Sequence, residues 1–148
     1  MPYSANYPAT LAEVLDPPVR FRPAVIEAVK RFARSKPYRG EMDERKEKFR
    51  TLHDDLCRIY GKHTRLTFGI IDGSDSRSSH FNRLSDEIVL CGKLSVVTAL
   101  HEFAHALERD ERGAVRWSTN LFRECFPRSF ARCYTQGHML RSGVDTKA

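Results

Sequence analysis

The spacing of apolar and polar positions predicts two helices in the first part of the chain. Apolar residues recur at helical intervals from Pro23 to Ala33, and the sequence Ser35-Lys36-Pro37 ends that pattern. A second helix is predicted from Glu41 to Tyr60, because apolar residues line one side of it and charged residues fill the other. Gly61 closes this helix, since glycine readily adopts the left-handed conformation of a helix end.

The middle of the chain predicts a small sheet. Two short runs rich in β-forming residues extend from Leu66 to Ile71 and from Glu87 to Cys91. The first run stops at the turn pair Asp72-Gly73. The polar stretch from Ser74 to Ser79 is expected to be a hairpin loop, with the return beginning at His80-Phe81.

Two further helices are predicted after the strands. Residues from Val96 to Leu107 are apolar on most sides of a helix, which indicates a buried helix that Ser95 caps. The next helix runs from Asp110 or Glu111 to Phe126, and Pro127 stops it. This order of elements predicts an α+β fold with N-terminal helices, a small twisted sheet, a buried helix and a following C-terminal helix.

Composition and length are consistent with one domain. The 148 residues, 41% of them hydrophobic, suffice for one compact core. Residues 1–22 are proline-rich and are expected to form an extended arm, which leaves residues 23–148 as the domain. The chain has no apolar run of membrane-spanning length and its first eight residues lack a secretory signal, so we expect a cytoplasmic protein. Its four cysteines form no C-x-x-C pair and are expected to be free thiols.

The net positive charge of the chain is compatible with an anionic partner but does not identify one. Lys and Arg number 25 against 19 Asp and Glu, which gives a net charge of +6. A basic surface favours contact with nucleic acid, but these cations are scattered along the chain rather than clustered. Nucleic acid therefore stays a secondary possibility beside a protein or peptide substrate.

The buried helix contains a motif with specific chemistry, His101-Glu102-Phe103-Ala104-His105. Two histidines four residues apart project from one side of a helix, so both imidazoles can reach one zinc ion. The glutamate between them can contact a water at that metal. Burying three such polar groups in an apolar helix is costly without partners, and a metal ion would offset that cost.

With this motif the sequence resembles the zincin metallopeptidases over about Leu66 to Pro127. The spacing of Ala114, Trp117-Ser118 and Leu121-Phe122 is similar to that of small ImmA/IrrE-type zincins of phages and mobile elements. The resemblance implies a sheet beside the motif helix, one zinc ion and peptide hydrolysis. In that family the third zinc ligand is a glutamate just before the matching alanine, but this sequence has Gly113 there.

The third ligand must therefore come from another residue. Glu111 is preferred, because it lies six residues beyond His105, a spacing that metzincin-like zincins also use. Those proteins turn the chain at a glycine midway, where this sequence has Glu108. The alternatives that remain are Asp110, Glu108, Glu124 and His138.

The motif also predicts a mechanism, with Glu102 as the general base that takes a proton from a zinc-activated water. By resemblance, the strand from Glu87 to Cys91 would form the rim of the substrate cleft. The residue that stabilises the oxyanion is open. Tyr134, His80 and His138 are the available types.

Three other residues are expected to have structural roles: Trp117 in the core, His53 on a helix surface and His63 in a loop. Our first hypothesis for function is a zinc metallopeptidase. The alternatives are a zincin-fold regulatory or DNA-associated protein and a catalytically silent zinc-binding protein. The substrate, the oligomeric state and the role of the arm are left open.

Overall fold

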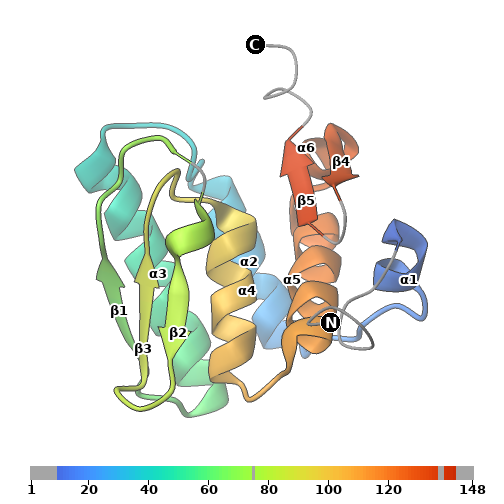
Figure 1. Ribbon diagram of the computed structural model, residues 1–148, viewed down its shortest axis with the longest axis horizontal. Helices are drawn as coiled ribbons and strands as arrows, with labels where there is room; N and C mark the ends of the chain where they lie inside the picture. The colour runs from blue at the N-terminus through green and yellow to red at the C-terminus, as the bar shows by residue number, and fades with distance from the viewer. Residues whose placement is uncertain (1–9, 75, 137–138, 143–148) are drawn as a thin grey trace.

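The computed structural model describes residues 10–74, 76–136 and 139–142 and has a mixed α+β fold (Figure 1). The helices are α1 Leu11–Leu15, α2 Pro23–Arg34, α3 Met42–Tyr60, α4 Val96–Ala106, α5 Glu111–Cys125 and α6 Pro127–Ala131, with a 3-10 turn at Ser76–Ser78. The strands are β1 Arg65–Phe68, β2 His80–Asn82, β3 Glu87–Leu90, β4 Cys133–Gln136 and β5 Met139–Ser142. The four long helices and the main strands that the sequence pattern predicts are confirmed to within a few residues.

The ends of these elements follow from local chemistry. Pro23 occupies the first turn of α2, where its missing N–H costs nothing. Gly61 ends α3 in the left-handed conformation, with φ of 66°. The Ser95 side chain accepts a hydrogen bond from the Thr98 backbone N–H, which caps α4 as predicted.

Strand order differs from the prediction. The three-stranded sheet has the order β1-β3-β2, with β1 parallel and β2 antiparallel to β3. The expectation that residues 74–79 form a hairpin loop between paired strands is therefore wrong, since β2 pairs with β3 and not with β1. The hairpin of this sheet joins β2 to β3 instead.

A close approach beyond the end of β1 helps to fix this arrangement. The Gly69 N–H donates to the Leu90 carbonyl at 2.8 Å, so the β1 segment stays beside β3 past Phe68. A Cβ atom at Gly69 would lie 2.6 Å from the Cys91 Sγ, a distance that only glycine avoids.

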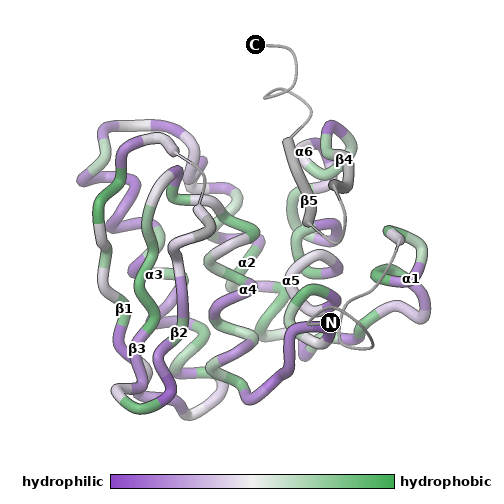
Figure 2. The backbone as a smooth tube through the Cα atoms, in the orientation of Figure 1, coloured by the Kyte–Doolittle hydropathy of each residue, from purple (hydrophilic) through white to green (hydrophobic). Residues whose placement is uncertain are grey.

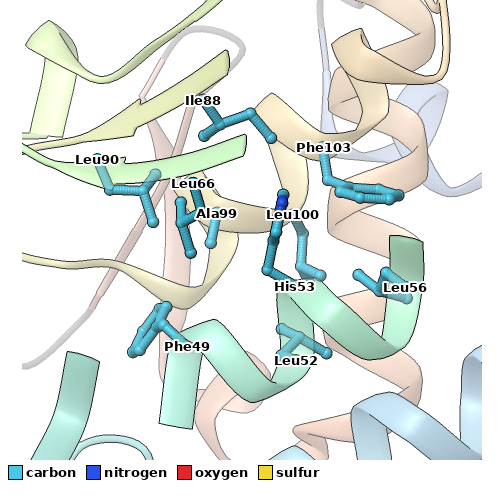
Figure 3. A pocket seen from close by; sticks show the side chains of 10 residues that line it. All are labelled: Phe49, Leu52, His53, Leu56, Leu66, Ile88, Leu90, Ala99, Leu100 and Phe103. Carbon is cyan, nitrogen blue, oxygen red and sulfur yellow. The ribbon is translucent and has the colours of Figure 1, made fainter. Parts of the chain in front are cut away.

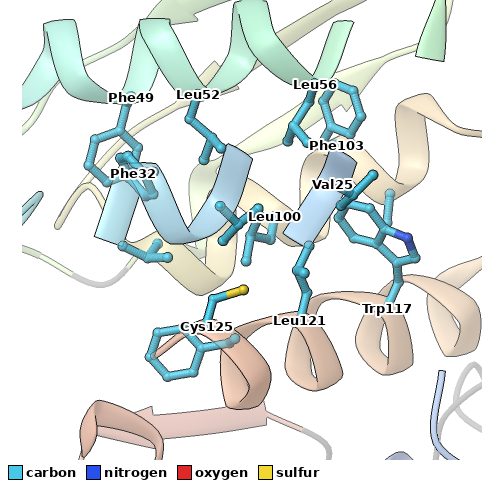
Figure 4. Close-up of a cluster of buried hydrophobic side chains, with 14 of the residues drawn as sticks. Val25, Phe32, Phe49, Leu52, Leu56, Leu100, Phe103, Trp117, Leu121 and Cys125 are labelled. Carbon is cyan, nitrogen blue, oxygen red and sulfur yellow. The ribbon is translucent and has the colours of Figure 1, made fainter. Parts of the chain in front are cut away.

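The core lies between the sheet and the helices. Leu66 pairs with Ile88 and Phe68 with Leu90 in register, which puts their side chains on one face. Figure 4 shows the larger cluster, where side chains of α2, α3, α4 and α5 meet around Leu100 and Trp117. Trp117 is 1% exposed and stacks near Phe103, so its predicted core role is confirmed.

The chain continues beyond α5 in a way that the sequence pattern did not predict. Pro127 ends α5 as expected, but it also begins the short helix α6. The strands β4 and β5 then form an antiparallel pair. Cys57, Cys91 and Cys125 are free thiols, as predicted.

Part of the proline-rich arm packs on α5. Val14 of α1 is 3% exposed, and its carbonyl accepts hydrogen bonds from the Asn120 Nδ2 at 2.9 Å and the Arg116 Nε at 3.3 Å. Arg116 also donates to the Pro17 carbonyl. The arm is therefore held on the outer side of the helix that begins with Glu111.

Candidate metal centre

Helix α4 brings the two motif histidines together on one side. His101 and His105 lie one turn apart, and their ring centroids are 4.8 Å apart. The two Nε2 atoms face each other at 3.2 Å. Both side chains are partly exposed, with 18% and 25% of their surface accessible, so the pair lies in the molecular surface rather than in the core.

A tight turn then carries the chain from α4 to α5 (Figure 1). Figure 2 shows this connection as a hydrophilic segment below the apolar parts of the two helices. Glu108 has φ of 69°, a left-handed conformation that lets the chain reverse immediately after α4. Asp110 then caps α5, and Glu111 is the first residue of that helix.

Three potential ligand atoms converge where the two helices meet. The Glu111 Oε1 lies 3.2 Å from the His101 Nε2 and 3.0 Å from the His105 Nε2. In a tetrahedral zinc site with bonds of about 2.0–2.1 Å, neighbouring ligand atoms lie about 3.3 Å apart. The three observed separations are close to that value, so the cluster can hold a metal ion.

The hydrogen bond at the Nδ1 atom of His105 determines which ring nitrogen carries the proton and which carries the lone pair. The Nδ1 atom lies 2.9 Å from the Arg109 carbonyl, which only accepts hydrogen bonds, so Nδ1 carries the proton. In the neutral ring the Nε2 atom then has a lone pair directed at another acceptor, the Glu111 carboxylate. Either a second proton on the ring or a bound cation would resolve this convergence of acceptors, and a hydrogen bond at Nδ1 of this kind is typical of metal-binding histidines.

The pKa shifts within the cluster come from the same contacts between the two imidazoles and the carboxylate. Burial by itself raises the pKa of the Glu111 carboxyl, but hydrogen bonds from both imidazoles outweigh it and hold this pKa well below its usual range. The hydrogen bond to Glu111 raises the pKa of His105, although burial opposes this. The site thus favours a negative carboxylate beside positive charge.

Glu102 lies on the same helix but is more deeply buried, with 8% exposure. Burial raises the pKa of its carboxyl, and the nearby positive charges of His101 and His105 partly oppose that rise. Among the described residues, none donates a hydrogen bond to this carboxylate. A buried carboxyl without a hydrogen-bond donor is costly, and the positive charges of the two histidines offset part of that cost.

The structure separates Glu111 from the other acids considered as third ligand. Asp110 instead accepts a hydrogen bond from the Gly113 N–H at 2.8 Å. Glu108 forms an exposed ion pair with Arg83 at 2.8 Å. Glu124 is exposed, thirteen residues along α5 from Glu111, which corresponds to about 20 Å.

Gly113 stands at the position where the zincins that this sequence resembles have their third ligand. It faces the turn between α4 and α5. A Cβ atom there would lie 3.2 Å from the Asp110 Oδ1 and 3.3 Å from the Arg109 Cβ. A glutamate at this position would therefore press on the α4–α5 connection.

Sequence reasoning missed the Arg109 carbonyl entirely, because a backbone acceptor has no signature in residue type.

The candidates for oxyanion stabilisation are only partly placed. His80 is exposed on β2 and lies near enough to Glu102 to influence its pKa, after the larger effects of burial and the motif histidines. His138 and the side chain of Tyr134 lie outside the described residues. None of the three has a described contact that assigns this role.

Two structural expectations have different outcomes. His63 lies in an exposed loop, as predicted. The expectation that His53 is on a helix surface is wrong, since it is 7% exposed and lines a cavity of about 10 Å³ beneath α4 (Figure 3). The strand from Glu87 to Cys91, which was expected to offer an exposed edge, does not do so. Strand β3 is central and paired on both sides, and the strand at the edge beside α4 is β2.

No protein family, curated protein or solved structure that was compared matches this chain. Within residues 10–74, 76–136 and 139–142, none of the helices has both the length and the apolar character needed to cross a bilayer. The functional argument therefore depends on the geometry of the site.

Proposed function

We propose that this protein is a zinc-dependent peptidase of the zincin type, with His101, His105 and Glu111 as metal ligands and Glu102 as general base. The observation that carries the proposal is the convergence of three acceptor atoms, separated by 3.0–3.2 Å, at the junction of α4 and α5. Two imidazoles and one carboxylate at tetrahedral spacing are the donor set that zinc prefers.

The number of ligands supports a catalytic rather than a structural ion. Structural zinc sites usually have four protein ligands, whereas catalytic sites have three and leave one position open. Among the described residues, the cluster contains three ligand groups, and both histidines are partly exposed to solvent. A substrate could therefore approach the centre.

Glu102 has the properties that a general base needs. When bound, zinc supplies the positive charge that lowers the pKa of a water and polarises a carbonyl group. The Glu102 carboxyl is close enough to His101 and His105 for their charge to act on it, and burial raises its pKa toward the range where it can both accept and release a proton. It would take the proton of the attacking water and deliver it to the leaving amine.

The exposed edge of the sheet supports a peptide as substrate. Strand β2 lies next to α4 (Figure 1) and pairs with β3 on one side only, as far as the described strands show. An extended peptide can add to such an edge through backbone hydrogen bonds, which would bring a peptide bond alongside the motif helix.

The proposal predicts separate effects for base and ligands. Purified wild-type protein should contain about one zinc ion, and His101→Ala, His105→Ala and Glu111→Ala should each lose it. Glu102→Gln should keep zinc and lose hydrolysis of unfolded casein by at least about 100-fold, because it removes the base but no ligand. Metal analysis and a casein-cleavage assay measure both effects.

Glu108→Gln is the matched control, since its carboxylate pairs with Arg83 and not with the metal ligands. It should retain zinc and activity. A zinc-free wild type, or an active Glu102→Gln variant, would contradict the proposal. Zinc binding without any hydrolysis would favour the catalytically silent alternative.

A further inference from the structure

The direction of the Glu111 carboxylate depends on the first turn of α5. Glu111 is the first residue of this helix, and no full turn precedes it to hold its backbone. The Asp110 Oδ1 accepts a hydrogen bond from the Gly113 N–H at 2.8 Å, and the Asp110 carbonyl accepts one from the Ala114 N–H at 2.8 Å. Asp110 thus closes the turn from which Glu111 projects.

The same connection also orients His105. Its Nδ1–H donates to the Arg109 carbonyl at 2.9 Å, and the Arg109 N–H donates in turn to the Ala104 carbonyl at 3.1 Å. In the chain, Asp110 lies between Arg109, whose carbonyl orients His105, and Glu111. A change in the backbone at residue 110 would therefore move two of the three ligands relative to each other.

The turn has little room for alternative arrangements. A Cβ atom at Gly113 would already lie 3.2 Å from the Asp110 Oδ1, a tight contact. Because Gly113 has no side chain, the Asp110 carboxylate can lie against the backbone at the start of α5. Gly113, which stands where the resembled family has its ligand, is therefore the residue whose N–H donates to the capping Asp110 carboxylate.

We propose that Asp110 is a positioning residue of the metal centre: its hydrogen bond to Gly113 fixes the first turn of α5 and so aims Glu111 at the two histidines. This inference rests on the proposed function. Partners that orient metal ligands typically contribute about 10- to 100-fold to metal affinity. Asp110 touches no ligand atom in the described contacts, and it acts through the backbone.

The test is the zinc dissociation constant of the purified full chain, measured by competition with a chromophoric chelator. Asp110→Ala removes the cap and should raise this constant about 10- to 100-fold. Asp110→Asn retains a side-chain oxygen that caps helices as well as aspartate, so it should bind zinc within about threefold of wild type. Rescue by asparagine would show that the hydrogen bond matters rather than the charge.

A matched control separates positioning from general stability. Ser95→Ala removes an equivalent cap from α4, six residues before His101. It should lower thermal stability but leave the zinc constant unchanged. Should Asp110→Ala fail to fold, Asp110→Gly takes its place, because it removes the same hydrogen bond at little cost in helix stability.

Wild-type zinc affinity in Asp110→Ala or Asp110→Gly, or an equal loss in Ser95→Ala, would overturn the inference while leaving the proposed function intact. A wild-type protein that binds no zinc would overturn both. Zinc binding by the wild-type protein, combined with weaker zinc binding in Asp110→Ala or Asp110→Gly, supports the inference whether or not casein is cleaved.

Discussion

His53 shows how a single buried side chain can make stability depend on pH. Its Nε2–H donates to the Thr64 carbonyl at 2.7 Å, the Cys57 Sγ lies 3.4 Å from the same nitrogen, and the ring meets Phe103 edge-on. Burial lowers the pKa of His53, and the hydrogen bond to Thr64 only partly opposes this. The folded protein thus favours the neutral ring.

The sign of the effect follows from linkage. The unfolded chain protonates His53 at about pH 6.5, whereas the folded chain does so at a lower pH. Below pH 6.5 the unfolded state binds more protons, so the free energy of unfolding should fall by up to about 1.4 kcal/mol per pH unit. His53→Gln can still donate to Thr64 but does not titrate.

We therefore predict that wild-type stability declines more steeply than that of His53→Gln between pH 7 and pH 5. Urea unfolding of both proteins, at the same zinc concentration, measures the difference, and the metal contribution cancels. Parallel stability curves would show that burial of His53 does not control this titration.

At the same scale, sequence and structure contribute differently to the site. The His101 and His105 pair could be predicted from the sequence alone, because a helix repeats every 3.6 residues and puts positions four apart on one side. Spacing in the sequence could not by itself settle the choice between Glu111 and Asp110 as the third ligand. It depends on which carboxylate caps α5 and which faces α4.

At the scale of secondary-structure elements, the N-terminal arm is connected to helix α5. Helix α5 carries Glu111 at its start, and the arm crosses it further along. Asn120 is 4% exposed and donates to the Val14 and Arg116 carbonyls at 2.9 and 2.8 Å. This amide connects the arm to the helix that begins with Glu111.

Asn120→Ala should destabilise the protein by about 1–3 kcal/mol, because it loses two hydrogen bonds, to the Val14 and Arg116 carbonyls. It should also expose the arm to trypsin at Arg20. Urea unfolding and limited proteolysis provide the two readouts. The control is Thr51→Ala, whose exposed hydroxyl donates a hydrogen bond to the Glu47 carbonyl of its own helix. Unchanged proteolysis in Asn120→Ala would mean that other contacts hold the arm.

Strand pairing was the element-scale feature that sequence reasoning got wrong. Composition and turn residues locate β1, β2 and β3 well, because β-branched and aromatic residues favour extended backbone. They do not say which strands are neighbours. That choice depends on contacts between segments distant in sequence, such as Gly69 against Cys91.

Across the whole molecule, the candidate metal centre joins two helices that also share the core. Helices α4 and α5 contribute Leu100, Phe103, Trp117 and Leu121 to one buried cluster (Figure 4). A metal ion held by His101, His105 and Glu111 would add a further connection between them at the surface end. Metal binding should therefore stabilise the fold.

Removing zinc with a chelator should lower the melting temperature. At free zinc 100 times its dissociation constant, binding stabilises the folded state by about 2.7 kcal/mol. For a chain of this size that corresponds to about 5–10 °C. Calorimetry with and without chelator measures the shift. His101→Ala should melt at the same temperature in both conditions, and a zinc-dependent shift in this variant would contradict the ligand assignment.

The sequence by itself determined the helices, the approximate strands and the paired histidines, because these follow from periodicity and local propensity within a few turns of chain. Only the tertiary structure decided the strand order, the burial of His53 and the meeting of Glu111 with both histidines. Each of these depends on segments packing across the molecule, where excluded volume and hydrogen-bond partners select one arrangement among several that the local pattern allows.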